Sequence, residues 1–480
     1  MITSSRILLL PLIAVLSAMH TPLSAQPAAA PTALLDRTIA RMGGDSALRA
    51  IRTVRLDVMT QWARTSFANR PFADQPSYER NVELRDYASG AWRNTRNFFG
   101  AGPSLPIVDV VRDTIAVRYG PTSAAGALGW VPLNVAYVAE RRELFAMAPE
   151  RLVLSVRHAP TLRTLADTTV NGESHARFGA TIDGWPVTLF VRRIDALPTL
   201  VRFRADEVED FGLAPWGRHE VEFWYSGWQP ISAGVLLPRQ RDVRRVGRPY
   251  KRMTVLGMQV NAPAPSDSFA ISDSLMAAYL VTERRPMWQV DVEKTGRMVR
   301  DRFAVTPPIT GSPGAVRLGG MWILFETAQH EGAMTLIAEW LGRVTPGVPI
   351  GAGIATMPSV SNGGARWFAD ARRPLFIAPG AAPFVQRITG RSNVGTVVST
   401  ARWVRMGSDS LWIEPFDAPD ISGALAIYSP TLRWLYLPMA GAPNVRDEQA
   451  ALTARLAARG LPVEWIGSVR ALVTAVPPAK

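Results

Sequence analysis

The chain has 480 residues, enough for roughly two or three domains, and it lacks cysteine, which excludes disulfides, thiolate chemistry and cysteine-ligated metals. Its formal net charge is +13, but nearly all of its cationic residues are arginines, and they form no long basic block. The charge therefore favours a solvated basic surface, with loose affinity for anionic lipid or polysaccharide as the second interpretation, and argues against a nucleic-acid partner.

The first residues have the form of a secretory signal. Arg6 precedes an apolar run from residue 7 to about residue 18, and small residues ending in "LSA" follow. The run is too short to span a bilayer, and the Ala- and Pro-rich sequence after it fits poorly with a buried helix. We predict a signal peptide over residues 1–25, cut after Ala25, then a flexible leader over residues 26–32. The protein is therefore expected to be exported, to the periplasm or beyond the cell.

Residues 33–280 are predicted to form a curved antiparallel sheet with a helix or two against it. Apolar residues share one face of residues 33–42, and a glycine pair stops that helix. Alternating stretches such as "VRLDVMT", "PVTLFVRR" and "HEVEFWYSGW" then indicate half-buried strands. An Asn-Gly pair at residue 171 and an Asp-Gly pair at residue 183 supply the tight turns of a meander.

Four stretches of this region resemble the open-barrel fold of periplasmic lipoprotein carriers. They are "VNGESHARFGATI", "VTLFVRRIDALPTLVRF", "EFWYSGWQPISAGVLLPRQ" and "VNAPAPSDSFAI". The resemblance implies a curved sheet that could enclose a lipid-sized cavity. One function left open is therefore an apolar-ligand or lipid carrier.

Residues 281–310 are predicted to be a connector, although they could also supply the first strands of the next domain. Over residues 311–480 strands and helices alternate. "MWILFETA" is a continuous apolar strand, "GAMTLIAEWLGRV" an amphipathic helix and "IGAGIAT" a strand, and the helix "RDEQAALTARLAARG" comes near the end. This order predicts sheet layers covered by helices.

The order of elements in residues 311–480 resembles the metallo-β-lactamase superfamily, whose fold is an αββα sandwich. In that superfamily a strand ends in Thr-His-x-His-x-Asp-His, followed by a small residue, Gly-Gly and a helix. The stretch "GIATMPSVSNGGARWFADARRPLFIAP" keeps the strand, the Gly-Gly, the helix and the next strand. With Gly363 and Gly364 aligned, the ligand positions fall on Thr356, Pro358, Val360 and Ser361.

Three later landmarks follow in the family's order. "DISGALAIYSP" places Asp420 at the next histidine, "WLYLPM" places Met439 at the bridging aspartate, and "VEWIGSV" places Ser468 at the last histidine. A catalytic zinc needs about three or four imidazole or carboxylate ligands that converge on it. His330 is the one histidine in residues 311–480, so no shift of register restores a multi-histidine site.

The sequence thus predicts an α+β chain whose C-terminal sandwich has lost its zinc ligands. Our leading hypothesis is a binding or scaffold protein of the cell envelope, without metal, cofactor or assigned catalytic residues. A lipid or another envelope component is left open as partner. The alternative to a non-catalytic role is a metal-independent hydrolase that reuses Asp420, Ser361, Ser468 or His330, although His330 also suits an ordinary loop or helix cap. The vestigial pocket comprises Thr356, Pro358, Val360, Ser361, Asp420, Met439, Ser468 and His330.

Overall fold

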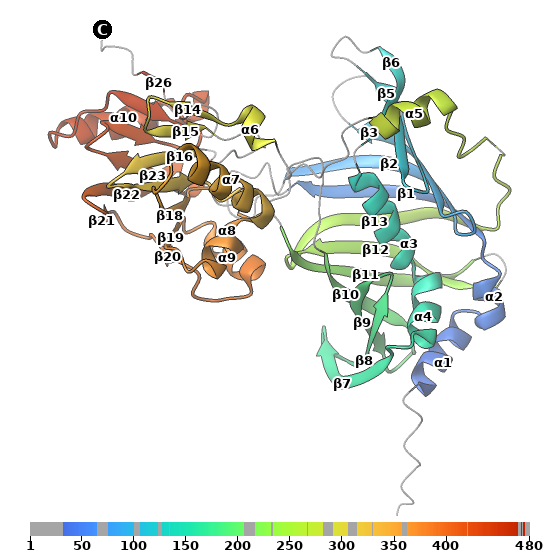
Figure 1. Cartoon of the computed structure of the whole chain (residues 1–480). Coiled ribbons are helices and arrows are strands. Elements are labelled where there is room, and N and C mark those ends of the chain that lie inside the picture. The colour runs from blue at the N-terminus through green and yellow to red at the C-terminus, as the bar shows by residue number, and fades with distance from the viewer. Residues whose placement is uncertain are drawn as a thin grey trace, which may run out of the picture.

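The structure is a computed structural model (Figure 1). It describes residues 32–64, 75–99, 106–122, 127–133, 135–205, 217–231, 234–265, 267–281, 291–305, 314–328, 330–357, 362–419, 421–468, 472 and 474–475. The predicted signal peptide lies outside these residues. No helix among them is long and apolar enough to cross a membrane.

The N-terminal half is one large antiparallel sheet, as predicted. Its thirteen strands run in the spatial order β6-β5-β4-β3-β2-β1-β13-β12-β11-β10-β9-β8-β7, so β1 and β13 meet in the middle. The strands are β1 (Thr53–Arg64), β2 (Gln75–Asp86), β3 (Ala91–Phe99), β4 (Ile107–Arg112), β5 (Ile115–Pro121), β6 (Leu128–Pro132), β7 (Arg163–Val170), β8 (Glu173–Ile182), β9 (Trp185–Arg192), β10 (Pro198–Ala205), β11 (His219–Pro230), β12 (Leu236–Arg245) and β13 (Arg248–Val260).

Local sequence explains these strands and their turns. In β1 the side chains of Val54, Leu56 and Val58 are buried and their neighbours are not, the period of two that a one-sided strand requires. The residue pair at 171–172 and the pair at 183–184 both have positive φ, as a two-residue hairpin turn needs. Both predicted turns are therefore confirmed.

Helices fill the concave face of this sheet (Figure 1). They are α1 (Ala33–Arg41), α2 (Asp45–Arg49), α3 (Ala136–Ala146) and α4 (Pro149–His158). Side chains such as Leu35 of α1 and Leu152 of α4 pack with Val54, Phe178 and Val221 of the strands in one apolar core. On the opposite face, α5 (Asp273–Val281) packs on β5 and β6. The sequence analysis identified α1 but not α3 or α4.

The C-terminal half holds two further sheets. One has the order β14-β15-β16-β17-β18-β19-β20 and the other β21-β22-β23-β24-β25-β26. Their strands are β14 (Arg297–Val299), β15 (Phe303–Val305), β16 (Gly314–Leu318), β17 (Met321–Phe325), β18 (Ile350–Ala355), β19 (Leu375–Ile377), β20 (Thr396–Val397), β21 (Arg402–Met406), β22 (Asp409–Ala418), β23 (Ile421–Ser429), β24 (Trp434–Tyr436), β25 (Trp465–Gly467) and β26 (Thr474–Ala475). Thus β14 and β15, within the predicted connector, pair into the first of these sheets.

The two sheets share one apolar core. Phe325 of β17 lies 5.0 Å from Trp434 and 4.9 Å from Tyr436 of β24, measured between ring centroids. The helices of this half are α6 (Val292–Thr295), α7 (Glu331–Val344), α8 (Ala365–Asp370), α9 (Ala382–Thr389) and α10 (Arg446–Ala457). α7, α8 and α9 bury side chains in the shared core, whereas α10 packs on the other face of the second sheet through Leu452 and Leu456.

Among the described residues, the two halves touch where the turn between β12 and β13 meets α8 and α9. Val246, in the turn between β12 and β13, packs with Phe384 and Ile388 of α9. Arg387 donates a hydrogen bond to the Val246 carbonyl at 3.0 Å, and the Arg366 guanidinium of α8 donates to the carbonyl oxygen of residue 218. Apolar packing and backbone hydrogen bonds therefore fix this contact together.

Candidate functional site

The predicted C-terminal pocket can be followed at four of its positions. Thr356 comes directly after β18, Met439 three residues after β24, Ser468 directly after β25, and His330 directly before α7. The other predicted positions lie outside the described residues; they are Pro358, Val360, Ser361 and Asp420.

Strand pairing places Thr356 and Ser468 differently from Met439. The Thr356 carbonyl accepts a hydrogen bond from the Leu425 N–H of β23 at 3.0 Å, which links the two C-terminal sheets. Tyr436 pairs with Gly467, the residue before Ser468. Met439 instead packs with the apolar cluster beneath α10. Thr356 is thus bonded to the second sheet, in which Ser468 follows β25.

Glu326 is a buried carboxyl in this pocket that the sequence analysis missed. It follows β17, has no exposed surface, and adopts a positive φ of 60°, which is uncommon for a residue other than glycine. Its Oε1 accepts hydrogen bonds from the hydroxyls of Thr356 and, at 3.3 Å, Tyr436. Burial raises the pKa of Glu326 to about 7, although these hydrogen bonds favour the charged form. The sequence feature that could have revealed this residue is an acidic side chain directly after the apolar run "MWILF".

The described part of this pocket does not fit zinc. The Thr356 hydroxyl already donates to Glu326, and besides that carboxylate the predicted positions Met439 and Ser468 offer a thioether and a hydroxyl in place of imidazole. His330 caps α7, because its Nδ1 accepts a hydrogen bond from the Gly332 N–H at 2.9 Å. Among the described residues, no group of three or more histidine, aspartate or glutamate side chains could hold a metal ion.

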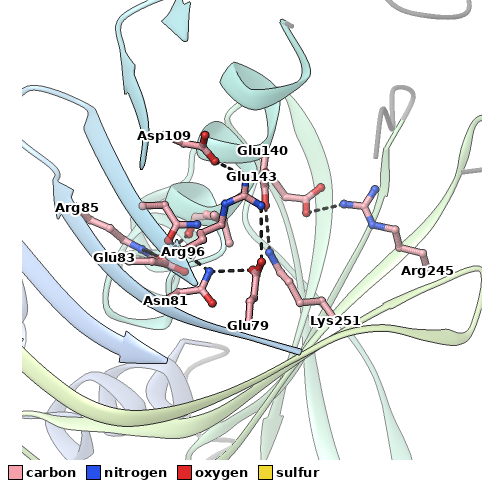
Figure 2. A network of polar contacts seen from close by, with 12 residues as sticks. Glu79, Asn81, Glu83, Arg85, Arg96, Asp109, Glu140, Glu143, Arg245 and Lys251 are labelled. Carbon is pink, nitrogen blue, oxygen red and sulfur yellow. Dashed lines mark hydrogen bonds and ion pairs between the residues drawn. The ribbon is translucent and has the colours of Figure 1, made fainter. Parts of the chain in front are cut away.

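A second polar site lies inside the N-terminal sheet (Figure 2). Here the helix layer supplies carboxylates, and β12 and β13 supply cations. The ion pairs are Glu140 with Lys251 at 3.1 Å, Glu143 with Arg245 at 3.2 Å and Glu150 with Arg241 at 3.8 Å. The strand cations point inward because side chains alternate along a strand: Arg241, Val243 and Arg245 of β12 are all buried, and the residues between them face outward.

The strands themselves carry more buried ion pairs, some of which Figure 2 shows. These pairs are Glu83 with Arg85 at 2.6 Å, Asp109 with Arg118 at 2.6 Å, Asp109 with Arg96 at 2.8 Å and Glu79 with Arg96 at 3.6 Å. Burial alone would raise the pKa of Glu83, but the nearby Arg85 and Lys251 charges lower it. A buried charge is tolerated only when it is paired. Shared partners connect Glu79, Arg96, Asp109 and Arg118 into one network, and Glu83 with Arg85 forms a further pair.

A small cavity of about 10 Å³ lies within this network. Trp62, Trp92 and Asn81 line it from the strands, and Tyr137 and Glu140 line it from α3. Such a volume holds about one water molecule. At this network the described interior of the sheet is therefore filled and charged, which counts against the apolar carrier that the sequence left open.

A larger groove of about 540 Å³ lies along β8 to β12. Arg192 in this groove forms ion pairs with Glu173 at 3.0 Å and with Asp195. The Arg244 guanidinium carbon lies 4.7 Å from the centroid of the Trp224 ring. The groove is open, and its lining mixes charged side chains of both signs with Leu197, Trp224 and Trp228.

No family model and no curated protein matches this chain. Solved structures that are similar to it include a LolA-superfamily protein from Nitrosomonas europaea, with 9% identity and a TM-score of 0.32 over 50% of this chain and 97% of that one. A putative outer membrane lipoprotein-sorting protein domain from Vibrio parahaemolyticus has 8% identity and a TM-score of 0.30, over 49% and 95%. A metallo-β-lactamase from Pontibacter korlensis has 12% identity and a TM-score of 0.29, over 36% and 88%. Both families that the sequence resembles thus occur among these structures.

Proposed function

We propose that this chain is an exported, non-catalytic binding or scaffold protein of the cell envelope. In this proposal residues 33–280 form a carrier-like domain, and residues 311–480 form an αββα sandwich of the metallo-β-lactamase type whose metal pocket has become structural. The observation that carries it is the hydrogen bond from Thr356 to Glu326, because Thr356 stands at an aligned ligand position and is fully buried. A hydroxyl that is buried and hydrogen-bonded in this way stabilises the fold. It is not available to bind a substrate or to ligate a metal.

The layer order supports the sandwich. One side of the first C-terminal sheet shares a core with the second sheet, and α7 and α8 bury side chains such as Met334 and Phe368 in that core. The second sheet is covered by α10 on its other face. An outer helix on the second sheet and two sheets packed together agree with the order that the superfamily resemblance implies.

The test is the metal content and the metal response of the mature chain. The protein is produced without tag histidines in medium supplied with zinc, and bound metal is measured by elemental mass spectrometry. We expect near zero zinc per chain and no rise in melting temperature on adding zinc, since a ligand that binds the native state stabilises it. One or two zinc ions per chain, removed by a chelator with loss of stability, would overturn the proposal.

A second candidate function is favoured by the state of Glu326. A carboxyl with a pKa of about 7 can act as a general acid or base near neutral pH, and it lies against the hydroxyls of Thr356 and Tyr436. This would make the chain a metal-independent hydrolase. Chromogenic ester, amide, phosphate and sulfate substrates test it. Turnover that Glu326→Gln abolishes while the fold is retained would replace the binding proposal, and absence of turnover in the wild type would remove this candidate.

A further inference from the structure

A step in the N-terminal sheet creates the groove along β8 to β12. β10 pairs with β11 over residues 200–205, and the last of these pairs joins Leu200 to Trp224. β11 continues to pair with β12 on its other side as far as Pro230. The second half of β11 therefore extends beyond β10 as an overhang. Residues of the turn between β9 and β10 line the groove together with this overhang.

The overhang presents exposed main chain. Ser226, Gly227 and Gln229 are exposed, and the described residues provide no backbone partner for residues 226–229 on the side that β10 occupies earlier in the strand. Gly227 has a φ of 64°, which interrupts the extended backbone. An added peptide strand needs a continuous row of main-chain groups, which this overhang does not offer. Its N–H and C=O groups suit single hydrogen bonds to a smaller ligand.

Two indole rings line the groove, from Trp224 and Trp228, and both side chains are partly exposed. The Trp224 N–H donates to Glu222 at 3.0 Å, and the Arg244 guanidinium packs on its ring, so the indole is held in one orientation. Within the described part of the chain, no hydrogen bond engages the indole N–H of Trp228. An indole offers a large apolar surface together with one polar donor.

The charged side chains of the groove balance one another. Besides the pairs that Arg192 forms, Asp242 pairs with Arg252 at 3.5 Å. With Arg252 included, three carboxylates face three guanidiniums: Glu173, Asp195, Asp242, Arg192, Arg244 and Arg252. A groove without excess charge does not select a phosphate, a metal ion or an anionic polymer. A wholly apolar ligand would take water from these charges without replacing its hydrogen bonds.

The walls of the groove are fixed before any ligand binds. The buried Tyr225 hydroxyl donates to the Met147 carbonyl oxygen at 2.6 Å, which ties the overhang to the helix layer. In the turn, Asp195 accepts a hydrogen bond from the Leu197 N–H at 3.2 Å. Groups that are already held in place lose less conformational freedom on binding. The volume of about 540 Å³ also lies within the range of about 300–1,000 Å³ that is typical of ligand sites.

We propose that this groove binds a neutral oligosaccharide, with Trp224 and Trp228 as the surfaces on which sugar rings stack. A pyranose ring has C–H groups on its faces and hydroxyls around its edge, and each hydroxyl both donates and accepts hydrogen bonds. The faces therefore pack on the indoles, while the hydroxyls bind the arginines, the carboxylates and the exposed main chain. The proposal rests on the binding role proposed above and names the class of its ligand.

The test titrates the mature chain with three neutral tetrasaccharides, which are chitotetraose, cellotetraose and maltotetraose. Calorimetry measures binding, and tryptophan fluorescence reports contact with the indoles. We expect at least one of the three to bind at one site per chain and to change the fluorescence. The affinity should depend little on salt, because the charges of the groove are balanced. If none of them binds at up to about 10 mM, where even a millimolar site is filled, the proposal is rejected.

Substitutions locate the binding. Trp224→Ala and Trp228→Ala are each expected to weaken it about ten-fold, which is the order of one aromatic contact. The matched control is Trp403→Ala, because Trp403 of the C-terminal half is also a partly exposed tryptophan, and this variant should bind as the wild type does. Equal weakening in all three variants, or unchanged affinity in both groove variants, would place the binding elsewhere and overturn the proposal.

A further variant leaves the apolar core intact. Trp228 also packs against that core, so its removal can lower stability as well as affinity. Ser226→Phe instead adds bulk at an exposed position of the overhang, and should abolish binding while leaving the melting temperature unchanged. Should the tryptophan variants fail to fold, this variant decides, and full saccharide binding by it would exclude the groove.

A peptide strand is the other kind of ligand that an exposed strand edge attracts. A mixture of short synthetic peptides tests for it. Peptide binding that Ser226→Phe abolishes, without binding of any tetrasaccharide, would replace the saccharide by a peptide and overturn the proposal. The zinc measurement concerns the C-terminal half, so failure of this proposal and failure of the proposed function are separate results.

Discussion

The hydroxyl of Thr356 donates a hydrogen bond to the carboxylate of Glu326, thirty residues earlier in the chain. β17 and β18 are parallel neighbours, so their carboxyl ends place the two residues side by side. The Tyr436 hydroxyl from the second sheet joins the same carboxylate at 3.3 Å. These three buried groups tie both C-terminal sheets together where the family resemblance places a metal site.

Replacing Thr356 by valine should destabilise the chain. Valine has the same shape but cannot donate, so a buried carboxylate loses a partner, which costs about 1–3 kcal/mol. The free energy of unfolding in urea measures this effect. The control is Thr335→Val on α7, whose hydroxyl is exposed and which should change stability by less than about 0.5 kcal/mol. Equal stability of the Thr356 variant and the wild type would contradict the structural role.

Glu326 should make stability depend on pH. Its pKa is about 7 in the folded chain against an ordinary value of 4.5, because burial favours the neutral form. The resulting stabilisation is complete below about pH 4.5 and is lost as the pH rises through 7, by about 3 kcal/mol at most. Between about pH 5 and 8, the unfolding free energy of Glu326→Gln should therefore change less with pH than that of the wild type. Parallel curves for the two proteins would disprove this assignment.

The pair of Glu83 and Arg85 should show strong coupling. Removing Arg85 alone, as Arg85→Met, leaves a buried carboxylate without its partner and should cost about 3–5 kcal/mol. The double variant with Glu83→Gln should lose less than the two single variants together. A double-mutant cycle measures this, with the exposed pair of Arg343 and Glu293 as control, where coupling of about 0–1 kcal/mol is expected. Additive effects at Glu83 and Arg85 would show that the pair does not act as a unit.

His219 should make the chain sensitive to acid. It is buried beside the contact between the two halves, and burial together with the Arg245 charge lowers its pKa to about 3. The folded chain therefore favours neutral His219, and its stability falls as the pH drops from about 6.5 towards 3. His219→Gln, which cannot take up a proton, should lose less stability over that range. A variant as acid-sensitive as the wild type would assign the effect to other groups.

Part of the candidate site could be predicted because it depends on residue identity alone. Thr356, Met439 and Ser468 cannot supply imidazole or carboxylate ligands wherever they lie, so the chemical conclusion needed no coordinates. Their strand-end positions also followed from the order of elements. Pro358, Val360, Ser361 and Asp420 lie outside the described residues and remain predictions.

The sequence analysis missed the buried polar residues of the N-terminal half for one common reason. Glu79, Asn81, Glu83 and Arg85 are all buried and share one phase of β2, but polar residues in alternation read as the solvent side of a strand when no partner is known. α3 was missed for a related reason, since its inner face carries Glu140 and Glu143 and lacks the apolar stripe of an ordinary amphipathic helix.

The sequence by itself determined the features that depend on neighbours along the chain. These are the period of two in β1, the positive-φ turns at residues 171 and 183, the apolar run of β17 and the single histidine of residues 311–480. Only the tertiary structure decided which charges meet, such as Glu140 and Lys251, which are 111 residues apart. A repeating pattern states which way a side chain points, but the free energy of a buried charge depends on what lies opposite it.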